Sequence, residues 1–558
     1  MFARPAPLPF TRSTSGLASR IYRYHPSSAI PRSSRFVTPA LTVVRARGMS
    51  LFSSSASATS GAAASLALST AGMAVATLHP GIRKLMKNLD DLAPRFFLKR
   101  GQIDILKTPD EFYTVLKQKI ASAKKRVFLA TLYIGTTEHE LIDVLRTALL
   151  NNPDLQVFLL TDALRGTREA PNASSASLMA NLVAEFGDRV EVRLFHTPNL
   201  RGMKKAMIPQ RINEGWGLQH MKLYGFDDEI ILSGANLSHD YFTNRQDRYF
   251  LFRSADITNY YKRIYDAVGS LSYALSADDS QSGFRLSWPS TNPAPEPTKR
   301  ALKFVKVATR ILTPLIRSSR TDTSGELGLE DASTVTVLYP VSQFTPLLSP
   351  NTSTESPAIQ HLLDVVKTDH FSWTFTAGYF NIHPDYRDKL LSSMPREGTI
   401  ITAAPEANGF YKSAGISGYL PPAYTVLAKD FVKEVARRHK SDKIHLLEWQ
   451  NGVLNQPGGW TYHAKGIWIS PPEADPSQER PCITVIGSSN FTRRSHALDL
   501  ESNVIIITRD EELRSKMYNE IQHLKQFTRE MNEENFKSND RRVGWGVKAA
   551  LAVLGGML

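Results

Sequence analysis

"HMKLYGFDDEIILSGANLSHD", residues 220–240, places a histidine and a lysine two positions apart in a stretch with strand composition. Alternate side chains of a strand lie on one face, so His220 and Lys222 are predicted to point the same way. Asp227 follows, and a second apolar run ends in Ser-Gly-Ala-Asn at Asn236. The stretch therefore predicts two strands that bring an imidazole, an ammonium and an amide to one place.

The same pattern occurs a second time, in "HAKGIWIS" at residues 463–470 and "GSSN" at residues 487–490. His463 and Lys465 match the first histidine and lysine, and Asn490 matches the first asparagine. The second copy has a longer connection, "PPEADPSQERP", whose prolines and charges are typical of a surface loop. One such pair can arise by chance, but two pairs that each precede an asparagine indicate an internal duplication.

An acidic residue follows each asparagine at the same spacing. Asp247 lies eleven residues after Asn236, and Glu501 lies eleven residues after Asn490. We expect the two carboxylates to have the same role in both halves of the chain.

Each copy is preceded by signals for a helix and then a strand. "FYTVLKQKIASAKKRVFLATLYIG" (112–135) and "IQHLLDVVKTDHFSWTFTAGYFN" (359–381) both show this order, and further strands and helices alternate after them. Such alternation predicts an α/β fold. We expect two duplicated α/β sandwich lobes whose motifs face each other across one cleft.

Changes in composition predict the boundaries of five segments. Residues 1–90 are expected to be a leader with a linker, 91–275 the first lobe and 351–535 the second lobe. Residues 276–350 are rich in Ser, Asp, Pro and Thr and are expected to be a linker or insertion. Residues 536–558 are expected to be an apolar tail.

The net charge of +14 comes mostly from the first part of the chain. Residues 1–89 carry eleven Lys and Arg and no acid, and the remainder has 56 basic and 53 acidic residues. Nucleic-acid binding proteins usually carry a strong basic excess, so we expect no nucleic-acid partner. The Arg- and Ser-rich, acid-free leader is typical of a mitochondrial transit peptide, the alternative being a disordered basic tail.

Two segments raise the possibility of contact with a membrane. Residues 298–320 carry seven Lys and Arg with interleaved apolar residues, so they can lie on an anionic membrane or pack against a lobe, and Pro314 is expected to interrupt any helix. Residues 543–558 are apolar but too short to span a bilayer comfortably, and they can dock on a membrane or on the core. No other run is long and apolar enough to span, so peripheral association is expected.

The candidate site residues suit chemistry on a phosphate ester. One imidazole can attack phosphorus while the other protonates the leaving group. The lysines and amides can stabilise phosphate oxygens, and the phosphate-binding candidates are Asn236, Asn490 and Ser488. Asp247 and Glu501 can hold each imidazole in one tautomer. No cluster with metal-ligand spacing is present, so neither a metal nor another cofactor is expected.

The paired motifs resemble the H-x-K-x4-D motifs of the phospholipase D superfamily. The resemblance implies a two-lobed phospholipase D-like fold and a phosphohistidine on His220, with His463 as acid and then base. It also implies that the downstream acid of each half supports the histidine of the other half, Glu501 for His220 and Asp247 for His463. His220, Lys222, Asp227, His463 and Lys465 are the catalytic-motif residues. Ser470 replaces the second motif aspartate, which we expect to be a structural loss.

The second motif and its surroundings are more narrowly similar to mitochondrial CDP-diacylglycerol–glycerol-3-phosphate phosphatidyltransferases, which act in cardiolipin synthesis. This similarity implies CDP-diacylglycerol and glycerol 3-phosphate as substrates. It also implies peripheral contact with the matrix side of the mitochondrial inner membrane. Basic residues beside the motifs can hold the acceptor phosphate or be ordinary surface charges; they are Arg245, Arg248, Arg493 and Arg494.

Two other functions use the same residues. In a phospholipase D-type hydrolase or nuclease, water would resolve the phosphohistidine, and a cardiolipin synthase would use a different acceptor. In a non-catalytic lipid-binding scaffold, the Ser470 substitution would be a sign of decay, although both histidines and both lysines are retained.

Overall fold

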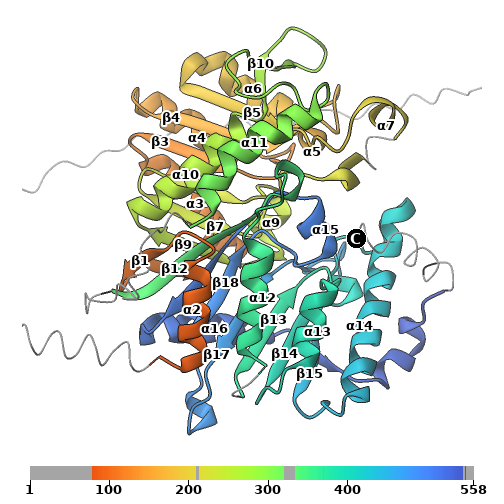
Figure 1. The fold of residues 1–558 in the computed structure, drawn as a ribbon. Coiled ribbons are helices and arrows are strands. Elements are labelled where there is room, and N and C mark those ends of the chain that lie inside the picture. Colours follow the sequence, from red (N-terminus) through yellow and green to blue (C-terminus); the bar gives the residue numbers. More distant parts are fainter. Residues whose placement is uncertain (1–77, 209–212, 319–333, 368–369, 545–546, 548–558) are drawn as a thin grey trace, which may run out of the picture. The chain divides into compact units, whose positions relative to one another are not determined.

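The structure, a computed structural model, describes residues 78–208, 213–318, 334–367, 370–544 and 547 (Figure 1). The predicted transit peptide, up to residue 77, and the apolar tail from residue 548 lie outside the described residues. Within the described part, no helix combines the length and the apolar character needed to cross a bilayer.

The first lobe is built on a nine-stranded mixed sheet (Figure 1). Its strands in sheet order are β11 (Phe284–Ser287), β10 (Tyr273–Ala277), β5 (Val190–Phe195), β4 (Gln156–Asp162), β3 (Arg126–Ala130), β6 (Leu223–Phe226), β7 (Glu229–Ser233), β9 (Tyr249–Arg253) and β2 (Ile103–Leu106). Strands β3, β4 and β5 are parallel, and β3 and β4 are apolar along most of their length because both faces of the sheet are covered. One face packs against α3 (Pro109–Ser122), α4 (His139–Asn151) and α6 (Ser175–Phe186), and the other packs against α10 (Ala255–Gly269) and α11 (Ala301–Ile316).

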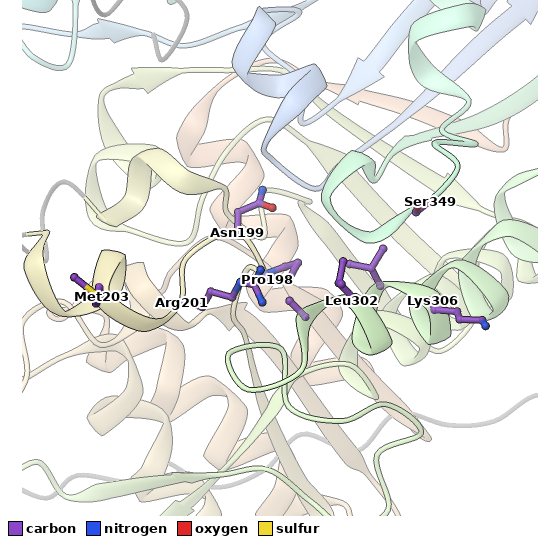
Figure 2. A pocket seen from close by; sticks show the side chains of 9 residues that line it. Pro198, Asn199, Arg201, Met203, Leu302, Lys306 and Ser349 are labelled. Atoms are coloured by element: carbon purple, nitrogen blue, oxygen red, sulfur yellow. The ribbon is translucent and has the colours of Figure 1, made fainter.

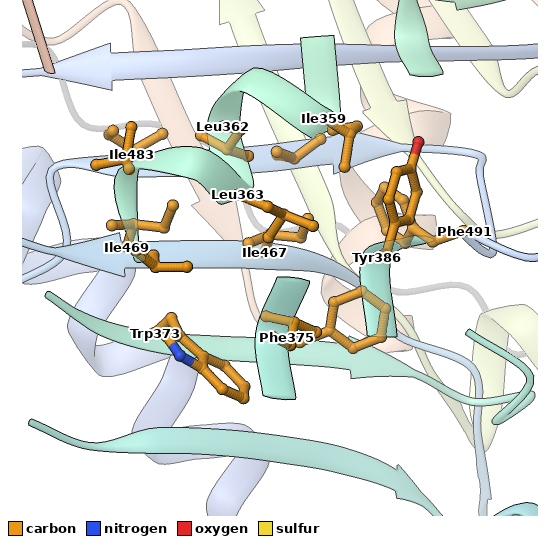
Figure 3. Close-up of a cluster of buried hydrophobic side chains, with 14 of the residues drawn as sticks. Ile359, Leu362, Leu363, Trp373, Phe375, Tyr386, Ile467, Ile469, Ile483 and Phe491 are labelled. Atoms are coloured by element: carbon orange, nitrogen blue, oxygen red, sulfur yellow. The ribbon is translucent and has the colours of Figure 1, made fainter. Parts of the chain in front are cut away.

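The second lobe has a sheet of the same size. Its strands in sheet order are β1 (Phe96–Lys99), β12 (Thr334–Gln343), β19 (Glu501–Thr508), β18 (Ile483–Gly487), β17 (Lys465–Ser470), β13 (Ser372–Ala377), β14 (Gly398–Ala403), β15 (Ile444–Trp449) and β20 (Thr528–Met531). The helices on one face are α2 (Pro80–Asp90), α12 (Glu355–Val365), α13 (Pro384–Ser392) and α14 (Leu420–Arg437), and α16 (Glu511–Lys525) covers the other. Figure 3 shows the core beneath α12, where Leu362 and Leu363 meet Ile467 and Phe375 of the sheet.

The predicted duplication is confirmed by the order of the strands. The run β5-β4-β3-β6-β7-β9 in the first sheet corresponds to β15-β14-β13-β17-β18-β19 in the second. The helix-then-strand signals fall on α3 with β3 and on α12 with β13, as the sequence predicts. The fold is therefore the expected α/β arrangement of two related lobes.

The two lobes share one hydrophobic core. Leu232 and Phe250 of the first sheet belong to the same buried cluster as Leu338, Val504 and Ile506 of the second. Two short strands add to this contact, because β8 (Arg245–Gln246) pairs with β16 (Thr461–Tyr462) across the lobes. Four short helices follow in chain order: α5 (Ala163–Gly166), α7 (Gly202–Met207), α9 (His239–Thr243) and α15 (Arg493–Ala497).

The chain crosses between the sheets near its N-terminal end. Strand β1 pairs with β12 of the second lobe, and β2, which follows closely, pairs with β9 of the first lobe. Helix α2 also packs against α12 of the second lobe. Strand β12 comes from the segment 276–350 that the sequence predicts as a linker or insertion. The five segment boundaries themselves stay predictions.

The basic segment 298–320 forms α11 in its described part, and the prediction that Pro314 interrupts the helix is wrong. The helix continues through Pro314 to Ile316 and ends there. Proline removes one backbone donor and crowds the carbonyl four residues earlier, and the packing of α11 against the lobe offsets this cost. That packing comes from an apolar stripe which includes Phe304 and Leu312, both fully buried.

Candidate active site

The two motif histidines lie where the lobes meet. The prediction that they stand within strands is wrong, because β6 and β17 both begin after the histidine. The backbone N–H of His220 donates to Leu500 O (3.0 Å), and that of His463 donates to Gln246 O (2.8 Å). Each histidine is thus anchored by backbone to the opposite lobe, which explains why it leaves the ladder of its own sheet.

Each imidazole meets the carboxylate of the other half. His220 Nδ1 lies 2.9 and 3.0 Å from the two oxygens of Glu501, and His463 Nδ1 lies 2.6 Å from Asp247 Oδ2. All four side chains are buried or nearly so. An Nδ1–H that donates to a carboxylate leaves Nε2 unprotonated in a neutral imidazole. This is the tautomer that a nucleophile at Nε2 requires.

The two lysines complete the buried cluster. Lys222 Nζ donates to His220 O at 2.6 Å. Lys465 Nζ lies 3.5 Å from Asp247 Oδ2 and donates to Gly234 O at 3.4 Å, so it reaches from the second lobe into the first. A Cβ at Gly234 would lie 2.6 Å from Asp247 Oδ1 and 2.8 Å from this ammonium, so any larger residue there would displace one of these two side chains.

Electrostatic interactions connect the two halves of this cluster. Burial lowers the pKa of His463 well below its usual value, and the charges of Lys465, Arg245, Lys222 and His220 lower it further. Three of these four groups belong to the first lobe. A group of charges that share one field in this way can act on a single substrate phosphate.

Burial sets the protonation states near neutral pH. It lowers the pKa of His220 well below the usual value, with Lys222 as the second cause. Burial also lowers the pKa of Lys222 to about 7 and raises that of Glu501 to about 7. Neutral imidazoles favour nucleophilic attack, and groups that titrate near pH 7 exchange protons readily.

The predicted phosphate-binding side chains border the same cluster. Asn236 Nδ2 donates to Tyr241 Oη, while the Oδ1 atoms of Asn236 and Asn490 are buried without a hydrogen-bond partner among the described residues. Ser488 instead donates its hydroxyl to Glu501 Oε2. The two free oxygens can only accept a hydrogen bond, so each amide would meet a phosphate oxygen through its Nδ2 group, whereas the serine is committed to the carboxylate.

Sequence reasoning missed the aromatic side chains around His463. Tyr241 Oη lies 3.3 Å from His463 Nε2, and the ring of Tyr379 stands edge-on to the imidazole with centroids 5.4 Å apart. Tyr379 also contacts the rings of Phe410 and Tyr424. These residues lie outside the duplicated motifs, so only their proximity in space could reveal them.

Comparisons with known proteins agree with this geometry. A family profile described as "Cardiolipin synthase, PLD-like domain" matches residues 116–268. The chain is 50% identical over 469 residues to the CDP-diacylglycerol–glycerol-3-phosphate 3-phosphatidyltransferase of Saccharomyces pastorianus, covering 82% of this chain and 89% of that protein. The chain belongs to this phosphatidyltransferase family. Its Homo sapiens relative, named as mitochondrial, is 34% identical over 82% of this chain and 83% of its own length.

The fold of this phosphatidyltransferase occurs in a crystal structure of phosphatidylserine synthase from Haemophilus influenzae Rd KW20. The TM-score is 0.62 at 21% identity, with 84% of this chain and 96% of that chain covered. The phospholipase D-like fold predicted from the motifs is confirmed by this likeness and by the family profile.

The four candidate arginines of the phosphatidyltransferase have different surroundings. Arg248 is only 1% exposed and bonds to Glu520, Val485 O and Lys465 O, so it cannot hold an acceptor phosphate. Arg248 is neither a phosphate ligand nor the surface charge that the sequence left as the alternative, because it is buried and its five donors are used to join the lobes. Arg245, 2.8 Å from Asp240, and Arg494, 3.0 Å from Asp499, lie near the histidines. Arg493 is exposed.

The motif aspartate is not brought to the imidazoles. Asp227 lies at the far end of β6 and accepts the backbone N–H groups of Lys124, Lys125 and Arg126 at 2.7 to 3.0 Å. Its contacts fix the entry to β3, which supports a structural function. Its counterpart Ser470 ends β17 and pairs with Ser372. Among the described residues, no group of three or more His, Cys, Asp or Glu side chains is placed to hold a metal ion.

Proposed function

We propose that the protein transfers the phosphatidyl group of CDP-diacylglycerol to glycerol 3-phosphate through a phosphohistidine on His220. The observation that carries this proposal is the exchange of carboxylates, in which Glu501 holds His220 and Asp247 holds His463 inside one buried site. Family membership supports the two substrates, since the relatives are named for them.

In the first step, Nε2 of His220 attacks the phosphorus that carries diacylglycerol. The N–P bond forms, the P–O bond to CMP breaks, and CMP leaves with the bonding electron pair. Lys222, Lys465 and the two asparagine amides stabilise the charge on the phosphate oxygens. A phosphate dianion or diester anion beside His463 raises its pKa, so this imidazole can carry the proton that the leaving group takes.

In the second step, a hydroxyl of glycerol 3-phosphate replaces CMP. His463 accepts the hydroxyl proton, the new O–P bond forms, and the N–P bond to His220 breaks. The products are phosphatidylglycerophosphate and free enzyme. The closed aromatic surroundings of His463 favour an organic acceptor over bulk water, since water must be excluded for transfer to exceed hydrolysis.

We also propose that the protein works in the mitochondrion, peripherally on the matrix side of the inner membrane. The acid-free, Arg-rich leader and the mitochondrial names of the animal relatives support this location. The proposal includes no cofactor and no nucleic-acid partner.

The test is an acceptor panel with purified protein and CDP-diacylglycerol labelled in the phosphatidyl group. CMP release should require glycerol 3-phosphate, and omission of acceptor should leave a labelled adduct that is absent in His220→Ala. His463→Ala should lose turnover by roughly 10²- to 10⁴-fold, the usual contribution of a general acid–base. Release that does not depend on the acceptor would indicate a hydrolase, and an acceptor preference for phosphatidylglycerol would indicate a cardiolipin synthase. Absence of any adduct would favour a lipid-binding scaffold.

A further inference from the structure

A patch of exposed apolar side chains lies on the first lobe, between α7 and the start of α11. Met203 and Met207 on α7 are 78% and 75% exposed, and Leu302 on α11 is 84% exposed. They are the three most exposed large hydrophobic side chains of the described residues. Isolated exposed apolar residues are common, but three together on two neighbouring elements indicate a contact surface.

Basic side chains surround this patch. Arg201, Lys205, Lys303 and Lys306 are all exposed. No acidic residue occurs in the stretches 197–208 and 297–318. We call the patch and its basic rim the α7–α11 surface, made of Arg201, Met203, Lys205, Met207, Leu302, Lys303 and Lys306.

The surface encloses a hollow of about 880 Å³. Figure 2 shows Arg201 and Met203 on the α7 side and Leu302 and Lys306 on the α11 side, with Pro198 between them. Helix α11 buries its apolar stripe in the core, so Leu302 and the lysines stand on its free face. Apolar side chains surrounded by basic ones suit a bilayer surface, where the apolar groups can reach the acyl chains and the basic groups can contact the headgroup phosphates.

One wall of the hollow continues into the active site. Asn199, which lines the hollow, donates to Trp216 O at 3.4 Å. Leu218, two residues further along this segment, donates its backbone N–H to Asp499 Oδ1 at 3.0 Å. His220 follows after two more residues. A lipid surface at the hollow would therefore lie against the loop that carries the proposed nucleophile.

The opposite wall also reaches the site. Ser349 lines the hollow and follows the short helix η3 (Thr345–Leu347). Thr345 Oγ1 donates to His496 O in α15 at 2.5 Å, and α15 carries Arg494, whose charge acts on His220.

We propose that the α7–α11 surface docks the protein on a bilayer that contains anionic phospholipid, with Met203, Met207 and Leu302 entering the interface. Lys303, Lys306 and the other basic residues then contact lipid phosphates. The inference extends the proposed function, because a bilayer held there would present the diacyl substrate beside the active site.

The experiment measures flotation of the full chain with two kinds of vesicle, phosphatidylcholine alone and phosphatidylcholine with about one third phosphatidylglycerol. Lys303→Glu with Lys306→Glu should lower partitioning onto the anionic vesicles by more than about 25-fold, since each removed charge is worth about fivefold. Met203→Ser with Leu302→Ser should lower partitioning onto both kinds by about tenfold. The basic leader contributes equally to every variant.

Matched controls come from the second lobe. Met394, 47% exposed, is changed to serine, and Lys433, an exposed residue of α14, is changed to glutamate. Both controls should bind vesicles as the parent does, within about twofold. Surface variants that float like the parent would overturn the proposal, and so would controls that lose as much binding as the surface variants.

A second measurement separates this proposal from the proposed function. Phosphatidyl transfer is measured with CDP-diacylglycerol dispersed in detergent micelles, where docking on a bilayer is not needed. The surface variants should keep parental activity there and lose it on vesicles. If the surface variants lose as much activity in micelles as on vesicles, the proposal that this surface acts by membrane docking is contradicted. If the parent protein has no transferase activity but its vesicle binding still depends on these residues, the proposed function is refuted and the proposed docking surface is not.

Discussion

Replacement of Glu501 by glutamine should stop catalysis without disturbing the fold. In the structure, Ser502 N–H donates to Ser488 Oγ at 3.0 Å, and the Ser488 hydroxyl in turn donates to Glu501 Oε2. The other acceptor within its reach, Ser502 O, lies farther away at 3.4 Å, so Ser488 donates preferentially toward position 501. A glutamine there must turn its carbonyl oxygen toward Ser488 and its NH₂ toward His220.

The NH₂ group would then lie where Glu501 Oε1 now lies, 2.9 Å from His220 Nδ1. It can only donate, so Nδ1 must accept and the proton moves to Nε2. A protonated Nε2 cannot attack phosphorus. A wrong tautomer of this kind costs roughly 10⁴-fold in kcat in a serine protease triad, and we expect a loss of similar size here.

The assay is a quenched single-turnover measurement of the labelled phosphatidyl adduct together with CMP release. Glu501→Gln combined with Ser488→Ala frees the amide to rotate and should recover at least about tenfold of the lost rate, which a merely structural effect would not do. Glu355→Gln is the matched control. Burial, followed by the nearby Glu501, raises the pKa of Glu355 to about 8, so this carboxyl is already neutral at pH 7. Adduct formation by Glu501→Gln within about tenfold of the parent would refute the tautomer argument.

Three further changes test structural contacts. Arg248→Met should lower the free energy of unfolding by about 3 to 5 kcal/mol in urea denaturation, because it leaves Glu520 charged and buried without its partner. Glu355→Gln should flatten the pH dependence of stability: the folded carboxyl keeps its proton up to about pH 8, and so parental stability falls as pH rises from about 4.5 to 8, by on the order of 5 kcal/mol in all. Asp227→Ala should cost about 1 to 3 kcal/mol by leaving backbone donors without an acceptor, while kcat of the folded enzyme changes little.

Each of these changes has an outcome that contradicts its reasoning. Arg248→Met with Glu520→Gln should regain part of the stability, and a double variant no more stable than Arg248→Met alone would argue against a buried charge as the cause. Unchanged pH dependence in Glu355→Gln would assign the slope to other buried acids. Loss of kcat in Asp227→Ala, measured on protein shown to be folded by circular dichroism, would give this aspartate a function in catalysis.

The sequence predicted the parts of the site that the duplication repeats. The two H-x-K pairs and the two acids at equal spacing predicted which residues form the site, and the resemblance to the phospholipase D superfamily that they carry implied which carboxylate meets which imidazole. Strand order in both sheets follows the same repeat. An internal duplication therefore predicts part of the geometry, namely that the two lobes share one strand order.

Features that occur only once escaped prediction. Tyr241, on α9, and Tyr379, in the loop after β13, reach His463 from outside the duplicated H-x-K motifs, so no motif spacing marked them. Arg248 was expected to be either a phosphate ligand or a surface charge, because charge alone does not tell an exposed guanidinium from one buried against Trp468, 3.8 Å from the ring. The histidines were placed in strands because strand composition extends past the point where the backbone turns to the opposite lobe.

Strand β1 precedes the first lobe in the sequence but lies in the sheet of the second lobe, and this placement affects how the chain folds during synthesis. Strand β1 ends at Lys99, and its partner β12 begins at Thr334, so more than two hundred residues leave the ribosome between them. Most of the first lobe is synthesised before β12, but β1 has no strand to pair with until β12 has been made. If the two halves were expressed as separate fragments, the first would contain β1 without its partner, and the second would contain β12 with that edge unpaired. The whole polypeptide, rather than either repeat alone, is therefore the unit that folds completely.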